Sequence, residues 1–235
     1  MNQYRVPALQ CLAALPVLCG PAFAHAQDSA GLSTEFEIGV VSDYRYRGDS
    51  LSDEKPAFQA GAIVSTTGGW YAGTWGYTIA EYGVGPDGDG ADVEVDLFAG
   101  KAFSLGAYDI DLGVQAYLYP DGTDVNFAEI PVSVSRTSGA WTWTVQAVYT
   151  PRQDLAVSEA NHYVSGGLVW QAPERPWQVS ARIGYEDGAF APDGKIDWEV
   201  GAARAFGPVS VGLSYVDTDD ESIDGGLVAS VRTGF

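Results

Sequence analysis

Polar and apolar residues alternate along most of the chain in segments of about ten residues. The pattern is clearest in Asp92–Phe98, where Asp92, Glu94 and Asp96 are separated by aliphatic residues. A period of two gives a β-strand one polar and one apolar face. About 9–11 tilted residues are enough for a strand to cross a bilayer. The pattern therefore predicts an all-β chain of membrane-length strands.

Twelve such segments are predicted, and an even number returns the C-terminus to the side where the first strand begins. Their ranges are Glu35–Tyr46, Ala57–Ser65, Trp70–Ile79, Asp92–Phe103, Tyr108–Tyr119, Phe127–Ser135, Trp141–Tyr149, His162–Gln171, Trp177–Glu186, Lys195–Phe206, Val209–Val216 and Asp224–Phe235.

The connectors between these segments are alternately short and long. The short ones are Thr66–Gly69, Ser104–Ala107, Arg136–Ala140, Ala172–Pro176 and Gly207–Pro208. The others hold most of the acidic residues, glycines and prolines, which are typical of loops. This asymmetry predicts a transmembrane, antiparallel up-and-down β-barrel of about 12 strands, with short periplasmic turns and longer extracellular loops.

A soluble β-sandwich would show the same alternation, because it also buries one face of each strand. The aromatic residues favour the barrel, since they gather near both ends of the segments, as the two interfacial girdles of a membrane barrel do. One group lies near the short connectors (Trp70, Tyr71, Trp141, Trp143, Trp170, Trp177, Phe206, Phe235) and the other near the long ones (Tyr44, Tyr46, Tyr77, Tyr119, Tyr149, Tyr185, Tyr215).

Residues 1–26 have the features of a secretory signal peptide. Arg5 precedes the apolar run Val6–Cys19, and small residues before and at Ala26 suit a cleavage site. The run is shorter than the ~20 residues that a membrane-spanning helix needs, although an uncleaved anchor is the alternative. We expect the mature protein, residues 27–235, to form one barrel domain.

Cleavage would remove Cys11 and Cys19, so no disulfide is expected. It would leave 11 basic and 31 acidic residues, a formal charge of −20. Nucleic-acid binding is excluded, because phosphate recognition needs positive charge. Asp87, Asp89 and Asp92 have only part of the spacing of a calcium loop, so we expect no dedicated metal site and no cofactor.

If the polar faces point inward, twelve acidic and five basic side chains line the lumen. The candidates for the lumen or its constriction are Asp43, Arg45, Arg47, Glu94, Asp96, Asp109, Asp111, Arg182, Asp197, Glu199 and Arg232; Glu35, Glu37, Asp92, Glu129, Glu186 and Lys195 complete the set. An anionic lumen favours cations. The alternative is that arginines pair with these carboxylates and fill the interior, since twelve strands enclose less space than the 16–18 of aqueous porins.

The run Ser42-Asp43-Tyr44-Arg45-Tyr46-Arg47-Gly48, with Pro56–Gly61, Tyr71–Trp75 and Glu94–Gly100, resembles the TorF family, whose porin activity is inferred from architecture. The similarity in strand layout extends over the whole mature chain. It implies an outer-membrane location and a channel-like role, and it supplies no substrate and no site residues.

On a regular strand, Asp43, Arg45 and Arg47 would face inward, and Tyr44 and Tyr46 would face lipid at the outer rim. Gly48 would then release the chain into the loop. Two interpretations of the arginines are open: they create a local positive field at a constriction, or they belong to a structural charge cluster.

Catalysis is not predicted. A hydrolase would need a nucleophile, a base and an orienting group within reach of one another. Outer-membrane phospholipases carry a His-x-Ser pair, whereas His162 and Ser165 would lie on opposite faces of a regular strand.

The sequence thus predicts an outer-membrane porin, exported through a cleaved signal peptide, that forms a passive, cation-preferring channel for small hydrophilic solutes. The alternative is a closed structural or adhesive barrel whose acidic loops bind ions or partners. The expected partners are outer-membrane lipid and lipopolysaccharide, small hydrophilic solutes or cations, and the barrel-assembly machinery, which would recognise the C-terminal Phe235.

Overall fold

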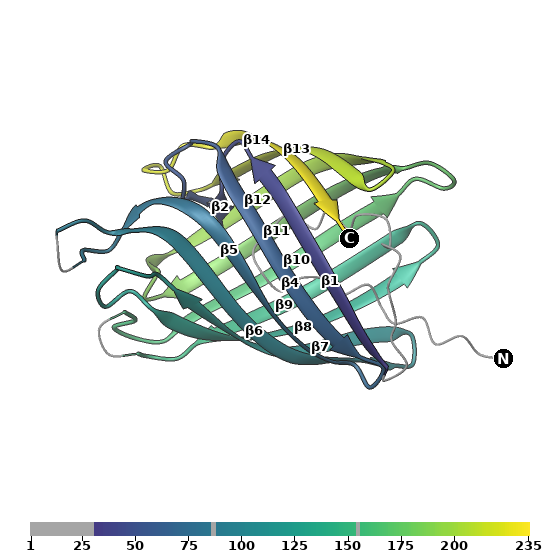
Figure 1. Ribbon diagram of the computed structural model, residues 1–235, viewed down its shortest axis with the longest axis horizontal. Helices are drawn as coiled ribbons and strands as arrows, with labels where there is room; N and C mark the ends of the chain where they lie inside the picture. Colours follow the sequence, from purple (N-terminus) through teal and green to yellow (C-terminus); the bar gives the residue numbers. More distant parts are fainter. Residues whose placement is uncertain (1–30, 86–87, 154–155) are drawn as a thin grey trace.

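Twelve strands form one closed antiparallel barrel in the computed structural model, which describes residues 31–85, 88–153 and 156–235 (Figure 1). The barrel strands are β1 (Leu32–Val41), β4 (Ala57–Thr66), β5 (Trp70–Tyr82), β6 (Ala91–Leu105), β7 (Tyr108–Leu118), β8 (Phe127–Ser138), β9 (Trp141–Thr150), β10 (Asn161–Gln171), β11 (Trp177–Gly188), β12 (Ala191–Phe206), β13 (Val209–Thr218) and β14 (Gly226–Gly234). The predicted fold class and strand count are confirmed. The expected signal peptide, residues 1–26, lies outside the described residues.

The barrel closes between the first and the last strand. Five residues of β1 pair with β14, and the backbone N–H groups of Phe36 and Phe235 each donate to the other's carbonyl oxygen at 3.0 Å. Their rings stack with centroids 5.8 Å apart. Closure removes the sheet edges, whose unpaired backbone groups would be costly in lipid.

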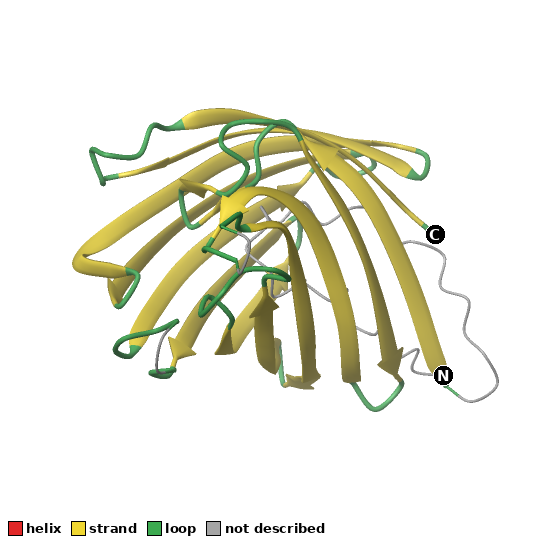
Figure 2. Ribbon diagram, turned by 60° about the vertical axis from the view of Figure 1, so that its left-hand side comes forward, coloured by secondary structure: helices red, strands yellow, loops and turns green. Residues whose placement is uncertain are grey.

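The turns and loops follow the predicted alternation with one exception. The short turns, residues 67–69, 106–107, 139–140, 172–176 and 207–208, join neighbouring strands at one end of the barrel. The connectors at the other end are longer, except residues 189–190, which join β11 to β12 in a two-residue turn where a longer loop was predicted. The barrel therefore has a short-turn end and a long-loop end (Figure 2).

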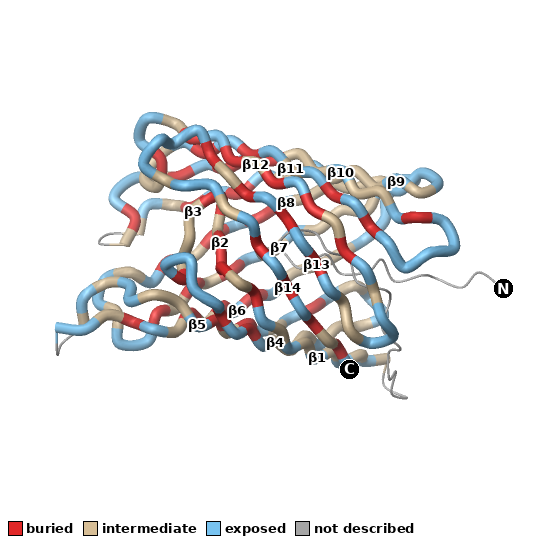
Figure 3. Tube along the Cα trace, turned by 90° about the horizontal axis from the view of Figure 1, so that it is seen from above, coloured by how far each residue is buried: buried red, intermediate tan, exposed pale blue. Residues whose placement is uncertain are grey.

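Buried and more exposed residues alternate along the barrel strands (Figure 3), as expected when successive side chains face the interior and the outer surface in turn. In β1, Phe36 and Ile38 are 45% and 50% exposed, whereas Val41 is buried. The same outer face carries exposed Leu, Val and Ile side chains on strand after strand. A continuous apolar outer surface would be unfavourable in water and suits a barrel surrounded by lipid. Among the described residues there is no helix long and apolar enough to cross a membrane.

The predicted aromatic girdles are only partly correct. Trp70, Trp141, Trp177, Phe206 and Phe235 are exposed at the short-turn end, and Tyr149, Tyr185 and Tyr215 are exposed at the long-loop end. Trp143 and Trp170 are half-buried on the same outer face. Tyr71, Tyr77 and Tyr119 are instead buried in the interior.

The first predicted strand is too long by five residues, because the chain leaves the barrel wall after Val41. Ser42 makes the last contacts with β14: its N–H donates to the Ala229 carbonyl at 2.8 Å, and its hydroxyl accepts from the Ala229 N–H at 2.9 Å. Residues 42–56, which we call the inward segment, then contain the small hairpin of β2 (Arg45–Tyr46) and β3 (Asp49–Ser50). Tyr44 is buried and Tyr46 half-buried there, so their prediction as lipid-facing residues was wrong.

Gly61 on β4 allows a large ring to lie against the wall of the barrel. It pairs with Trp75 of β5, and a Cβ at Gly61 would lie 2.4 Å from the Trp75 ring. The outward-facing Gly76 of the same hairpin is a contrast, since a Cβ there would meet its nearest atom only at 3.9 Å.

Gly61→Ala is therefore expected to destabilise the barrel by about 1–3 kcal/mol, because Trp75 must move within a filled interior. Urea unfolding in detergent micelles, followed by tryptophan fluorescence, measures this loss. The control Gly76→Ala should cause no comparable loss. Equal stability of the two variants would contradict this packing of Trp75.

Candidate functional site

The inward segment projects Arg47 into the barrel at the tip of a tight turn. Arg47 and Gly48 connect β2 to β3, and both have positive φ, 49° and 97°. A two-residue turn with two positive φ values matches the twist of a hairpin, and glycine adopts such a φ at little cost. The local sequence thus directs one guanidinium away from its own strand.

Arg47 ties the inward segment to two separate parts of the wall. Its Nη1 donates to Glu186 Oε1 of β11 at 2.6 Å, and its Nη2 donates to Glu129 Oε2 of β8 at 2.8 Å. The guanidinium also lies over the rings of Tyr46 and Tyr163, 4.6 and 4.4 Å from their centroids. We call these contacts the Arg47 clamp.

The clamp is buried and charged. The side chains of Arg47, Glu129 and Glu186 are 4%, 2% and 2% exposed. Burial by itself would lower the pKa of Arg47, but Tyr46 and the two carboxylates raise it well above its usual range. Arg47 therefore stays protonated. Removing it would leave Glu129 without a cation and Glu186 with only Lys195, whose Nζ lies 3.5 Å from Glu186 Oε2.

Polar side chains of the interior donate hydrogen bonds to the acidic side chains of β6. Tyr44 and Tyr119 each donate to one oxygen of Glu94 at 2.7 Å, and the Tyr44 ring stacks on Tyr77 with centroids 4.5 Å apart. Asp96 accepts from Gln115 Nε2 at 3.0 Å through one of its oxygens. This pairing explains why these tyrosines are internal, since a buried hydroxyl needs a partner that lipid cannot supply.

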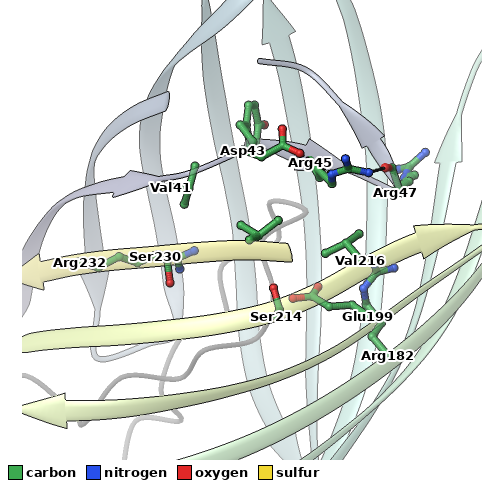
Figure 4. A pocket seen from close by; sticks show the side chains of 13 residues that line it. Val41, Asp43, Arg45, Arg47, Arg182, Glu199, Ser214, Val216, Ser230 and Arg232 are labelled. Atoms are coloured by element: carbon green, nitrogen blue, oxygen red, sulfur yellow. Dashed lines mark hydrogen bonds and ion pairs between the residues drawn. The ribbon is translucent and has the colours of Figure 1, made fainter. Parts of the chain in front are cut away.

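A small cavity lies between the inward segment and the wall formed by β11–β14 (Figure 4). Its charged lining consists of Asp43, Arg45, Arg47, Arg182, Glu199 and Arg232. It has room for roughly one or two water-sized molecules.

Most of the cations around this cavity already have anionic partners. Arg45 Nε donates to Asp43 Oδ2 at 2.5 Å, and Arg182 pairs with Asp197 at 2.5 Å and contacts the Tyr163 hydroxyl. Arg232 differs, because its Nε and Nη2 atoms are buried without a hydrogen-bond partner in the described part of the chain. Glu199 Oε1, which lines the same cavity, is likewise without a partner there. Such groups need water or a polar ligand.

The predicted lumen residues divide into separate places. Six of the eleven candidates line the cavity: Asp43, Arg45, Arg47, Arg182, Glu199 and Arg232. Asp197 does not line the cavity but forms an ion pair with Arg182, which does. Glu94 and Asp96 lie on β6. Asp109 and Asp111 start β7 at the short-turn end, where they accept from Ser104 and Tyr71, each at 2.6 Å.

Two further predictions can be compared with the structure. Asp92, predicted to be internal, is exposed at the long-loop end of β6, where the pairing with β5 becomes irregular. His162 is exposed against Tyr149, with ring centroids 5.3 Å apart, whereas Ser165 is buried, so the two residues occupy opposite faces. Among the described residues, no group of three or more His, Cys, Asp or Glu side chains is placed to hold a metal ion.

Sequence reasoning missed the internal aromatic residues. A signal was present in β5, where Tyr71, Trp75 and Tyr77 share one parity and the opposite face holds Ala72, Thr74 and Gly76. Large rings opposed to small residues on one strand indicate that the rings fill the lumen.

The sequence and the fold resemble bacterial proteins. The model of a family described as "Bacterial protein of unknown function (Gcw_chp)" matches residues 25–231. This match does not test the likeness to the TorF family, which stays a prediction. Among curated proteins, none matches this chain.

Two solved chains share the fold at low sequence identity, and a third is less similar. A chain described as "KdgM porin" has a TM-score of 0.57 at 7% identity, with 85% of this chain and 96% of that chain covered. A chain from a study of in-meso crystallisation of membrane proteins has a TM-score of 0.54 at 10% identity, with coverages of 86% and 83%. Salmonella typhi OmpF has a TM-score of 0.49 at 8% identity, with coverages of 90% and 100%.

Arg47→Met should destabilise the protein by about 3–5 kcal/mol, because Glu129 would remain buried without a cation and Glu186 would keep only its longer pair with Lys195. Urea unfolding in micelles measures the loss, and Glu129→Gln in the same chain should restore part of it. The control Lys55→Met removes the cation of an exposed pair with Asp53 and should leave stability unchanged. A loss no larger than that of the control would show that the clamp does not hold the segment.

Proposed function

The chain belongs to the Gcw_chp family of bacterial proteins of unknown function, and from this premise we propose that it is a passive channel of the outer membrane for small hydrophilic solutes. The observation that carries the proposal is a closed twelve-stranded barrel with an apolar outside and a charged inside. Closed barrels with this polarity are the form in which strands cross bacterial outer membranes. The short turns would then face the periplasm and the longer connectors the exterior.

We place the narrowest part of the passage beside the inward segment. The cavity there is lined by charged side chains together with valines, and the unpartnered atoms of Arg232 and Glu199 would be hydrated. A narrow, water-filled gap between the segment and β11–β14 would admit ions and small polar solutes and exclude larger ones.

Cation preference would come from interior acids that are not paired with a described cation. Asp109 and Asp111 of β7 are half-buried in the short-turn half of the interior, and no ion pair joins either of them to a described basic residue. The deeper acids Glu129, Glu186 and Asp197 are paired instead with Arg47 or Arg182. The field at the short-turn mouth would therefore be negative.

The Arg47 clamp supports a second candidate function. If the inward segment never moves, the cavity of one or two water-sized molecules would not conduct, and the barrel would be closed. Its acidic loops, including Asp217–Glu221, would then bind ions or surface partners. Phe235, 70% exposed after the last strand, would serve assembly in either case, as a C-terminal residue for the barrel-assembly machinery.

Purified protein in planar bilayers should give discrete single-channel steps, and a KCl gradient should give a reversal potential of the sign expected for cation preference. Asp109→Asn combined with Asp111→Asn should move that potential toward zero, because it removes negative charge from the mouth.

A matched control removes two exposed acids at the long-loop end by Asp187→Asn and Asp193→Asn, and it should shift the potential less. The absence of both conductance steps and liposome swelling would reject the channel and favour the closed barrel. Steps with anion preference would reject only the proposed selectivity.

A further inference from the structure

The outward charges carried by the barrel strands are separated by sign. At the long-loop ends of the strands the outward or exposed charges are acidic: Glu81, Asp92, Asp187, Asp193 and Asp217. At the short-turn ends, the outward charged residues of the described strands are all basic: Lys101 of β6, Arg136 of β8 and Arg204 of β12. The barrel function does not require this separation, because none of these residues faces the lumen.

Each of the three cations is paired across strands with a tryptophan. In the sheet register, Lys101 is opposite Trp70, Arg136 opposite Trp143, and Arg204 opposite Trp177. Two of these pairs are cation–π contacts, with the cation 4.8 Å from the centroid of Trp70 and 5.2 Å from that of Trp177. Arg136 lies over Tyr108 at 5.5 Å, and Tyr108 contacts Trp143 edge to face. The rings hold each cation at the edge of the apolar surface.

The three pairs are spread around the barrel. They occupy the strand pairs β5/β6, β8/β9 and β11/β12, so one pair recurs every third strand. The next position in this series is the closure between β14 and β1, where the Phe36–Phe235 stack lies instead. Together the pairs form a ring, which we call the cation–tryptophan belt.

We propose that the cation–tryptophan belt binds the anionic headgroups of membrane phospholipids at the short-turn end. A tryptophan and a cation at the boundary of an apolar band offer what an anionic glycerophospholipid presents: an interfacial glycerol region and a phosphate. The proposal does not depend on whether the barrel conducts.

The arrangement favours lipid over the other anionic ligands. A protein partner would need one contiguous patch, whereas the belt presents single cations around the circumference. Free phosphate would find one cation per site and no cradle of donors, since each cation has an aromatic ring as its neighbour.

The test uses the tryptophans of the belt as reporters. Full-length mature protein is folded into phosphatidylcholine vesicles that contain brominated phosphatidylglycerol or brominated phosphatidylcholine, and quenching of tryptophan fluorescence gives the relative affinity of the two lipids. Wild-type protein should prefer phosphatidylglycerol by roughly fivefold at each cation, the effect typical of one basic residue near an anionic surface.

Arg136→Gln with Arg204→Gln should reduce that preference by more than half. Lys55→Gln with Arg152→Gln removes the same charge from exposed residues of the long-loop end and should leave it unchanged. Faster migration of unheated protein on gels confirms that each variant is folded.

Two further measurements use wild-type protein alone and therefore do not depend on the folding of the belt variant. In wild-type protein, 1 M KCl should abolish the preference, because the Debye length falls to about 3 Å. Inorganic phosphate should leave it unchanged when compared at equal ionic strength. Equal quenching by the two lipids, equal loss in both double variants, or displacement by free phosphate would each overturn the proposal.

Discussion

Every backbone N–H and C=O group that faces lipid must find a partner within the protein, and this requirement governs the whole molecule. The chain meets it by pairing β1 with β14, so that the sheet has no edge. Once the sheet is closed, alternate side chains must face either lipid or the interior. Apolar side chains then occupy the outside, and the polar ones are confined to a narrow space.

Confinement explains the character of the interior. Carboxylates and arginines that are far apart in sequence come within hydrogen-bond distance, as Arg47 does with Glu129 and Glu186. Tyrosines supply neutral donors where a carboxylate lacks a cation, as at Glu94. The inward segment connects these groups, and a small gap remains beside it, next to Arg232 and Glu199. The proposed channel and the closed barrel differ only in whether this gap conducts.

The strand number, the short turns and the outward faces could be predicted from the sequence, because period two and connector length are local properties. The end of the first strand could not. Charged residues and tyrosines keep alternating through Asp43, Tyr44 and Arg45 after the chain has left the wall of the barrel. The pattern therefore does not indicate where the first strand ends. The inward parity expected for Asp43, Arg45 and Arg47 nevertheless led to the residues that line the cavity. The partners of Arg47 lie 82 and 139 residues away, and only the closed barrel determines that they meet.

The central claim is that the inward segment sets the size of the passage. Its most direct test is the single-channel conductance of the wild-type protein and of a variant in which residues 43–55 are replaced by a short Gly-Ser linker, with gel mobility used to confirm that both are folded. The account predicts small steps for the wild type and steps several-fold larger for the variant. Equal conductance in the two proteins, or no conductance in either, would contradict it.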